Sequence, residues 1–281
     1  MIRLLYALAL LFTVGAQASQ LQTTCGKIDT APAFEYCVYK TVGSTNTDVM
    51  YYLHGAGQNV HAWEIGGPGE DIRAQWEKAG KGAPTVVSLS YGPLWFLAKK
   101  NTSAVSGLYE DFIGRVLPTV EGSVLQRQVN KRLLFGISMG GFNSTQLYLN
   151  NPELFSRVVL GCPALVNISP YSSAEELKGY QERNHVSDGT MKYLEQVGAY
   201  YWPTAEAYNG DTPLATADQR LNASYPPLHI SSSDADAYGF EEGAKIFADK
   251  ATAHDVTVTW QFLKGGHCTL DTGSIAQFLL P

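Results

Sequence analysis

The feature that most constrains the fold is a serine surrounded by glycines, in the stretch FGISMGGF at residues 135–142. The stretch follows the apolar run KRLLFG, so the glycines interrupt what otherwise predicts a buried strand. Gly136 and Gly140 lie two positions before and after Ser138, in the pattern G-x-S-x-G. Glycine at these positions removes side chains that would clash in a tight strand-to-helix turn. The pattern therefore predicts that Ser138 lies on a strained turn above the edge of an α/β sheet, at the N-terminus of a helix.

The rest of the chain alternates in the way that such a sheet requires. Apolar runs typical of buried strands lie at 34–42, 48–55, 84–92, 131–137, 156–162, 226–233 and 256–263. Helix-like stretches lie at 107–120, 140–150, 241–253 and 274–280. The alternation predicts an α/β fold with a mostly parallel central sheet flanked by helices. Residues 163–225 contain no clear strand, and we expect a small, mostly helical insertion over the active site.

The N-terminal stretch MIRLLYALALLFTVGAQASQ predicts a secretory signal peptide, residues 1–18, followed by a single catalytic domain over residues 19–281. The stretch has a basic residue, Arg3, near its start, followed by an apolar segment that is short for a bilayer span. It ends in small residues, and cleavage is expected after Ala18. We therefore expect a secreted or periplasmic protein without stable membrane insertion. A net charge of -6 and the lack of a basic block argue against nucleic acid as a partner.

A serine hydroxyl needs a base to become a good nucleophile, and the chain offers six histidines. His267 is the strongest candidate because it lies in the loop LKGGHCTLD, just after the last predicted strand. In a sheet built in this order, that loop emerges at the same edge as Ser138. The other histidines fall at a strand end, in presumed surface loops, inside a predicted strand or at the end of a helix: His54, His61, His185, His229 and His254.

A catalytic histidine needs a carboxylate that fixes its tautomer, and two candidates follow the penultimate strand. The stretch HISSSDADAYGF places Asp234 and Asp236 where that strand gives way to a loop. After the preceding strand no acidic residue occurs until Glu175, which removes the main competing position. The resulting order of serine, aspartate and histidine is the order expected of α/β-hydrolases. The residues themselves leave the choice between Asp234 and Asp236 open.

An oxyanion hole needs backbone N–H groups that point to where the tetrahedral oxygen forms. One is expected from Met139, the residue after the candidate nucleophile. The second is expected from Ala56, in the small-residue turn His54-Gly55-Ala56-Gly57 after an earlier strand.

Taken together, these stretches resemble the esterase D branch of the α/β-hydrolases, which includes S-formylglutathione hydrolases, feruloyl and acetyl esterases and mycolyltransferases. The resemblance rests on VMYYLHGAGQNVHAWE, LLFGISMGGFNSTQLYLNNPELFSRVV, SSSDADAYGF and GGHC, and covers most of residues 34–281 apart from the insertion. It implies hydrolysis of a small-molecule or polymer-linked carboxylic ester through an acyl-enzyme, without a metal or other cofactor. It also implies that the acid is Asp236, although Ser233 stands where the family usually has glycine.

The four cysteines become informative in a secreted protein. Cys25 and Cys37 flank a short N-terminal segment, and we expect a disulfide that closes this segment as a loop. Cys162 and Cys268 each follow a predicted strand and are both expected at the catalytic edge. A disulfide that restrains the His267 loop and a pair of buried free cysteines are equally compatible with that placement.

Aromatic residues are concentrated where the insertion and an earlier loop should flank the site. Tyr200, Tyr201, Trp202 and Tyr208 either line a substrate pocket or pack the insertion onto the sheet domain. Trp95 and Phe96 follow a strand end and are expected on the opposite wall.

Three functional classes fit these residues. The leading hypothesis is a serine esterase with Ser138, Asp236 and His267 as its triad. An acyltransferase or thioesterase would use the same triad. A non-catalytic binding protein of the same fold is disfavoured, because the chain keeps every part that the chemistry needs.

Overall fold

The computed structural model describes residues 20–98 and 107–280. Within these ranges one sheet contains eight strands, in the order β1-β2-β4-β3-β5-β6-β7-β8. The strands are β1 (Leu21–Ile28), β2 (Phe34–Thr41), β3 (Val49–Leu53), β4 (Thr85–Ser90), β5 (Arg132–Ile137), β6 (Arg157–Gly161), β7 (Leu228–Ala235) and β8 (Val258–Gly266). β1 and β2 are antiparallel to their neighbours, and all strands from β4 to β8 in the sheet order are parallel. The predicted α/β fold with a mostly parallel sheet is confirmed. The predicted signal peptide lies outside the described residues.

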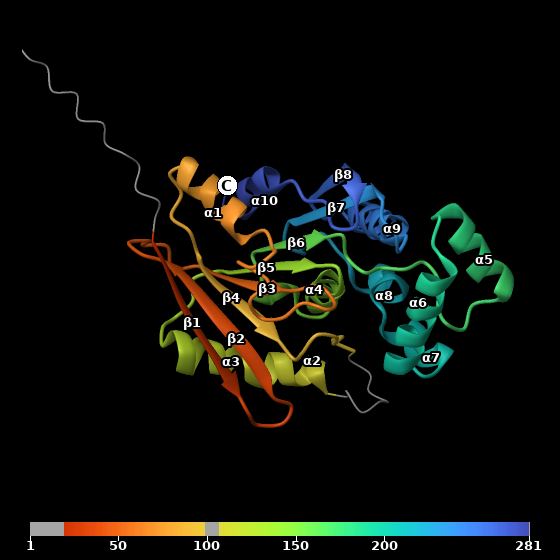
Figure 1. Ribbon diagram of the computed structural model, residues 1–281, viewed down its shortest axis with the longest axis horizontal. Helices are drawn as coiled ribbons and strands as arrows, with labels where there is room; N and C mark the ends of the chain where they lie inside the picture. The colour runs from red at the N-terminus through yellow and green to blue at the C-terminus, as the bar shows by residue number, and fades with distance from the viewer. Residues whose placement is uncertain (1–19, 99–106, 281) are drawn as a thin grey trace, which may run out of the picture.

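Helices cover both faces of the sheet (Figure 1). They are α1 (Gly69–Lys78), α2 (Leu108–Asp111), η1 (Phe112–Val116), α3 (Leu117–Thr119), η2 (Val120–Leu125), α4 (Met139–Asn150), η3 (Pro152–Leu154), α5 (Ala174–Arg183), α6 (Asp188–Tyr201), α7 (Ala205–Asp211), α8 (Pro213–Arg220), α9 (Phe240–Ala253) and α10 (Thr272–Leu279). One apolar core joins α4, α9 and the helical segment 108–125 to one face. A second core joins α1 and α10 to the other face. None of the helices in the described ranges has both the length and the apolar character needed to cross a bilayer.

The segment after β6 forms helices α5 to α8, as expected for the insertion at 163–225. In Figure 1, α5, α6 and α7 extend to one side of the sheet domain. Three of these helices begin at a serine or threonine, namely Ser173, Ser187 and Thr204, whose side chain accepts a hydrogen bond from a backbone N–H of the first turn. Such caps satisfy N–H groups that have no partner inside the helix, and they explain why short polar sequences are helical here.

The expected disulfide between Cys25 and Cys37 is present. The two cysteines face each other across the antiparallel strands β1 and β2, so the segment that the bond closes is a β-hairpin, which was not predicted from the sequence. β1 is mostly exposed and polar, with the sequence LQTTCGKI. An edge strand of this kind lacks the continuous apolar run that marks the buried strands, so it was not predicted from the hydrophobic pattern.

The predicted helix at 107–120 continues further than expected, to Leu125, and two of its segments are π-helical. Pro118 lies between these two segments. Proline has no backbone N–H and disturbs the regular i to i−4 hydrogen bonds, which accounts for an irregular helix at this point.

A buried histidine in β7 is expected to make the stability of the fold depend on pH. His229 is fully buried beside the ring of Phe278, and burial lowers its pKa from 6.5 to about 4. Between these pH values the unfolded chain binds more protons than the folded chain, so stability is lost as the pH falls from about 6.5 to about 4. We expect a loss on the order of 3 kcal/mol in the free energy of unfolding from this group.

Urea unfolding of the wild type and of His229→Gln at pH 7 and pH 4 measures this contribution. The glutamine variant should lose less stability on acidification than the wild type. His61→Gln, at an exposed position, is the control and should show the wild-type loss. An equal acid loss in wild type and His229→Gln would contradict the prediction.

Candidate active site

Ser138 lies on the turn between β5 and α4 with φ 54° and ψ −116°. Few residues other than glycine adopt these angles, so the backbone is strained at this point. Backbone hydrogen bonds hold it there: the Ser138 N–H donates to Gly161 O at 2.9 Å, and Ser138 O accepts from Phe142 and Ala164. The turn predicted from G-x-S-x-G is therefore present, and its conformation is fixed by contacts with the next strand and loop.

The flanking glycines are required by close backbone contacts. A Cβ atom on Gly136 would lie 2.0 Å from Gly140 O, and one on Gly140 would lie 1.9 Å from Leu53 O. A Cβ on Gly141 would lie 2.7 Å from Pro163 Cα. Real Cβ atoms do not approach backbone atoms this closely, so larger residues would displace the turn from β3 and from the loop after β6.

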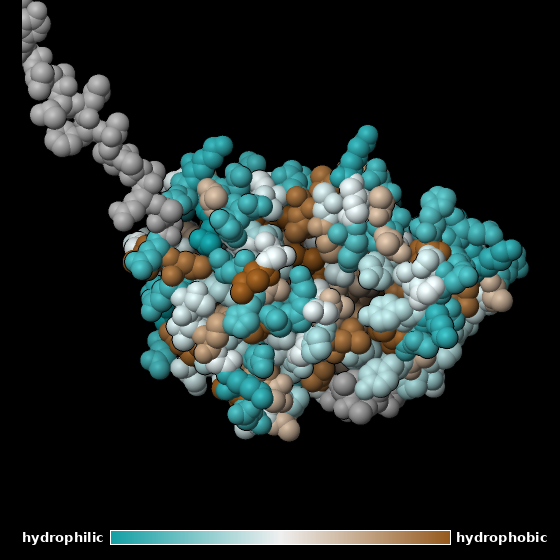
Figure 2. Space-filling model, in the orientation of Figure 1, coloured by the Kyte–Doolittle hydropathy of each residue, from teal (hydrophilic) through white to brown (hydrophobic). Residues whose placement is uncertain are grey.

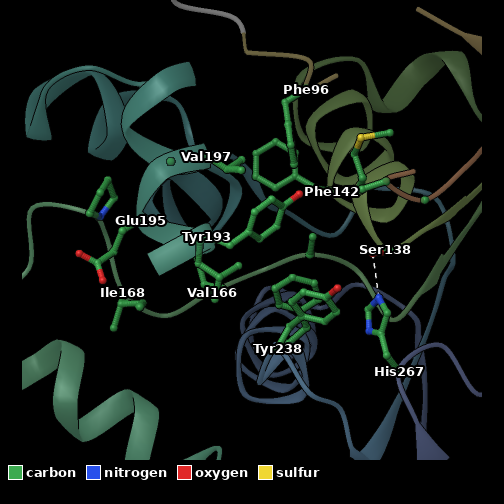
Figure 3. A pocket seen from close by; sticks show the side chains of 18 of the residues that line it. Phe96, Ser138, Phe142, Val166, Ile168, Tyr193, Glu195, Val197, Tyr238 and His267 are labelled. Atoms are coloured by element: carbon green, nitrogen blue, oxygen red, sulfur yellow. Dashed lines mark hydrogen bonds between the residues drawn. The ribbon is translucent and has the colours of Figure 1, made fainter. Parts of the chain in front are cut away.

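His267 and Asp236 lie in line with Ser138. Ser138 Oγ lies 2.9 Å from His267 Nε2, and His267 Nδ1 lies 2.7 Å from Asp236 Oδ2 (Figure 3 draws the first contact). The Asp236 carboxylate is fully buried, and its other oxygen accepts the backbone N–H of Tyr238 at 2.9 Å. The rings of Tyr238 and Phe240 pack edge-on against the imidazole. Hydrogen bonds thus hold both nitrogens of the His267 ring, and aromatic packing holds the ring itself.

Asp234, the other candidate acid, has a different partner. Its Oδ1 accepts the backbone N–H of Gly265 at 3.0 Å, and in the described part of the chain no hydrogen bond or ion pair joins it to His267, whose carboxylate partner is Asp236. Ser233 is fully buried and donates its hydroxyl hydrogen to Gly266 O at 2.6 Å. This is the position at which glycine was expected from the family resemblance. Both residues therefore connect the end of β7 to the end of β8, next to the loop that carries His267.

A disulfide joins Cys162 to Cys268, which resolves the two alternatives left open by the sequence. Both cysteines have positive φ, 42° and 63°, a region that residues other than glycine rarely adopt. Cys268 Sγ lies 3.3 Å from His267 Nε2. The bond thus links the loop after β6 to the residue next to the histidine.

Replacing both Cys162 and Cys268 by serine should lower both stability and activity. The bridge spans 106 residues, and closing so long a loop stabilises a protein by roughly 4 to 5 kcal/mol in the chain-entropy model. Without it, the two strained backbone positions are no longer held and the His267 loop gains freedom. Thermal unfolding and steady-state kinetics of the double variant measure the two effects.

The matched control is the double serine variant of Cys25 and Cys37, whose bridge lies at the edge of the sheet. It should lower the melting temperature while kcat stays near the wild-type value. Equal loss of kcat in both double variants would show that the Cys162–Cys268 bond acts only on overall stability.

The two predicted oxyanion-hole residues, Ala56 and Met139, both line the cavity together with Ser138. Within residues 20–98 and 107–280, neither backbone N–H has a hydrogen-bond partner. By contrast, the neighbouring N–H of Gly57 donates to Pro93 O at 2.8 Å. A pair of unpartnered N–H groups beside a serine is what an oxyanion hole needs.

The cavity beside Ser138 has a volume of about 260 Å³. Figure 2 shows apolar surface gathered around a hollow next to the insertion, and Figure 3 shows Ser138 and His267 at one end with Ile168 and Glu195 at the other. The walls come mainly from apolar and aromatic side chains of the insertion and of the sheet domain: Phe96, Phe142, Val166, Ile168, Tyr193, Val197, Trp202, Tyr208 and Tyr238. Such a lining favours an apolar substrate group.

The aromatic residues predicted around the site divide between the two roles considered. Phe96, Trp202 and Tyr208 line the cavity. Tyr201 is buried against Phe96, whereas Tyr200 is 53% exposed. Trp95 does not line the cavity but packs edge-on against His54. Sequence reasoning missed Tyr238, although its position two residues after Asp236 places it beside the histidine.

Two clusters of potential metal-ligating side chains occur among the described residues: Cys25, Cys37 and His61, and Cys162, His267 and Cys268. In each cluster both sulfur atoms belong to a disulfide. A metal-binding cysteine must be a thiolate, so these side chains do not form a metal site in the oxidised protein.

The sheet order, the strained serine turn and the loops that carry Asp236 and His267 define the α/β-hydrolase fold. Residues 39–232 match the family described as "Putative esterase". The chain therefore belongs to this esterase family and is a carboxylic ester hydrolase. Among curated proteins, no sequence matches the chain.

Solved structures share the fold at low sequence identity. An S-formylglutathione hydrolase from Agrobacterium tumefaciens is 17% identical with a TM-score of 0.66, and the match covers 94% of this chain and 97% of that one. A ferulic acid esterase is 16% identical with a TM-score of 0.61, covering 93% and 97%. A thermostable esterase from Pseudomonas putida ECU1011 is 18% identical with a TM-score of 0.62, covering 95% and 79%.

Proposed function

We propose that the protein is a secreted serine esterase that cleaves its substrate through an acyl-enzyme, with Ser138 as nucleophile, His267 as base and Asp236 as the acid that orients the base. The observation that carries the proposal is the chain of two hydrogen bonds from Ser138 Oγ through His267 to the buried Asp236 carboxylate. The Asp236 contact requires the hydrogen of the neutral imidazole to lie on Nδ1, which leaves Nε2 free to accept the serine proton.

In the first half of the reaction, His267 Nε2 takes the Ser138 hydroxyl proton while Oγ attacks the ester carbonyl carbon. The carbonyl oxygen becomes an oxyanion, which accepts hydrogen bonds from the N–H groups of Ala56 and Met139. The C–O bond to the leaving alcohol then breaks, and the imidazolium returns its proton to that alcohol. Ser138 is left acylated.

In the second half, His267 takes a proton from water as the hydroxyl oxygen attacks the acyl carbon. The same oxyanion hole stabilises the second tetrahedral intermediate. When it collapses, the bond to Ser138 Oγ breaks, and the proton returns to the serine as the carboxylic acid is released. The buried Asp236 carboxylate stabilises the imidazolium in both halves.

The cavity supports an ester with a small apolar or aromatic group next to the scissile bond. Its volume of about 260 Å³ lies just below the range of roughly 300–1,000 Å³ that is usual for ligand sites. The names of two solved neighbours, a ferulic acid esterase and an S-formylglutathione hydrolase, suggest aromatic esters and thioesters as the first compounds to test. Secretion is supported by the predicted signal peptide and by two disulfides, which persist in oxidising compartments.

A panel of p-nitrophenyl esters tests the proposal on the purified protein. It should contain acetyl, butyryl, lauroyl and feruloyl acyl groups, together with one acyl thioester, and include water-only and alcohol-containing reactions. We expect turnover of the short or aromatic esters, a burst of p-nitrophenol equal to the enzyme concentration, and release of free acid in water. Transfer of the acyl group to the added alcohol in preference to water would favour an acyltransferase instead.

A further inference from the structure

A buried histidine lies beside the proposed oxyanion hole. His54 directly follows β3 and is fully buried, and burial lowers its pKa below 6.5, so its ring is neutral at physiological pH. Its Nδ1 lies 2.8 Å from Gly55 O, and its Nε2 lies 2.8 Å from Ser90 Oγ. A carbonyl oxygen only accepts hydrogen bonds, so Nδ1 carries the ring hydrogen and donates it to Gly55 O. Nε2 is then an acceptor, for the Ser90 hydroxyl hydrogen and, at 3.5 Å, for the Trp95 Nε1 hydrogen.

The carbonyl that His54 holds belongs to the same peptide group as the Ala56 N–H. A trans peptide is planar, and its C=O and N–H bonds point in opposite directions. Gly55 O also accepts the N–H of Gln58 at 3.3 Å, and the Gly55 N–H donates to Gln58 Oε1 at 2.9 Å. With the carbonyl held from one side, the Ala56 N–H is directed to the other side and has no partner among the described residues.

The imidazole itself is fixed by the loop after β4. Ser90 Oγ accepts the Gly92 N–H at 3.0 Å, so the hydroxyl that meets His54 Nε2 is held in place. The Trp95 ring packs edge-on to the imidazole with centroids 6.0 Å apart. The Trp95 backbone N–H also contacts Met139 Sδ at 3.2 Å. The same small cluster thus contacts Met139 and the Gly55–Ala56 peptide group, which carry the two N–H groups proposed to bind the oxyanion.

We propose that His54 is a positioning residue that orients the Ala56 N–H toward the oxyanion through the hydrogen bond from its Nδ1 to Gly55 O. This inference rests on the proposed function, because it assigns a partner to the oxyanion hole of that mechanism. His54 does not touch the reacting atoms and transfers no proton. Its effect is exerted only when charge develops on the carbonyl oxygen.

Two substitutions separate the two nitrogens of the ring. Asparagine places an amide N–H donor close to the position of Nδ1, so His54→Asn keeps the bond to Gly55 O and loses the contact with Ser90. Glutamine places its amide close to the position of Nε2, so His54→Gln keeps a partner for Ser90 and loses the donor to Gly55 O. Each variant therefore removes the contacts of one ring nitrogen, since Nε2 also accepts the Trp95 Nε1 hydrogen at 3.5 Å, and the two variants are matched for polarity.

With p-nitrophenyl acetate as substrate, His54→Gln should lower kcat by about 10²-fold with KM within about twofold, because a lost oxyanion donor costs about 10² to 10³ in rate. His54→Asn should keep kcat within about fivefold of the wild type. The inhibition constant of an alkyl boronic acid, whose adduct resembles the tetrahedral intermediate, should rise in His54→Gln in step with the loss of kcat.

An equal loss of kcat in the two variants would overturn the inference. So would a loss of kcat that correlates with a lower melting temperature and leaves the affinity for the boronic acid unchanged. Peptide mapping of the wild type after fluorophosphonate treatment keeps the two proposals apart. A label on Ser138 combined with wild-type kcat in His54→Gln rejects the positioning role alone. A label elsewhere rejects the proposed function itself.

Discussion

Ser138→Ala should lower kcat for an ester substrate by a factor on the order of 10⁶ while the melting temperature stays close to that of the wild type. The alanine removes only Oγ, whose contact in the structure is with His267 Nε2. No acyl-enzyme can then form, and the remaining rate comes from the oxyanion hole and substrate binding alone. Relief of strain is not expected, because the backbone contacts of Ser138 do not involve its side chain.

The matched control is Ser144→Ala, which removes a buried hydroxyl from the same helix. Within the described part of the chain, Ser144 Oγ has no hydrogen-bond partner, so its loss should leave kcat within about threefold of the wild type. Steady-state kinetics and thermal unfolding of both variants make the comparison. Substantial turnover in Ser138→Ala, with another serine carrying the acyl group, would contradict the assignment of the nucleophile.

Asp236→Asn should be the second most damaging change, with a loss of about 10⁴ in kcat. Asparagine keeps the size of the side chain, but it removes the negative charge that stabilises the imidazolium. Its amide N–H can also face His267 Nδ1, which would place the ring hydrogen on Nε2 and leave that nitrogen unable to accept the serine proton. The fold should be retained, because the Tyr238 N–H can still donate to the amide oxygen.

Asp234→Asn serves as the matched control, two residues away in the same strand end. Asp234 accepts the Gly265 N–H through Oδ1, and an asparagine oxygen can accept the same hydrogen bond. We expect kcat within about threefold of the wild type. A larger loss in Asp234→Asn than in Asp236→Asn would move the acid to Asp234.

The arrangement of the site was predictable because it follows from chain order. In a mostly parallel sheet, residues at the carboxyl ends of strands meet at one edge, so Ser138, Asp236 and His267 converge although they are far apart in sequence. The turn could be predicted from the glycines around Ser138, because the fold requires glycine there. A side chain on Gly136 would collide with Gly140 O, and one on Gly140 would collide with Leu53 O.

Other features depended on packing that no local pattern reveals. The pairing of Cys162 with Cys268 requires the two loops to meet, and β1 is recognisable only from its partner β2. Tyr200 and Trp202 are two residues apart, yet one is exposed and the other lines the cavity, because α6 ends between them. The His54 ring, which contacts Gly55 O, likewise contacts Ser90, which comes from another strand.

The most direct test of the account is to identify the atom that becomes acylated. The purified protein is mixed with p-nitrophenyl acetate, quenched in acid within the burst phase, digested and analysed by tandem mass spectrometry, with a fluorophosphonate-treated sample alongside. The account predicts one acetyl group per protein on Ser138, the same residue labelled by the fluorophosphonate, and no adduct in Ser138→Ala. Turnover without any adduct on Ser138, or an adduct on another residue in the active protein, would contradict it.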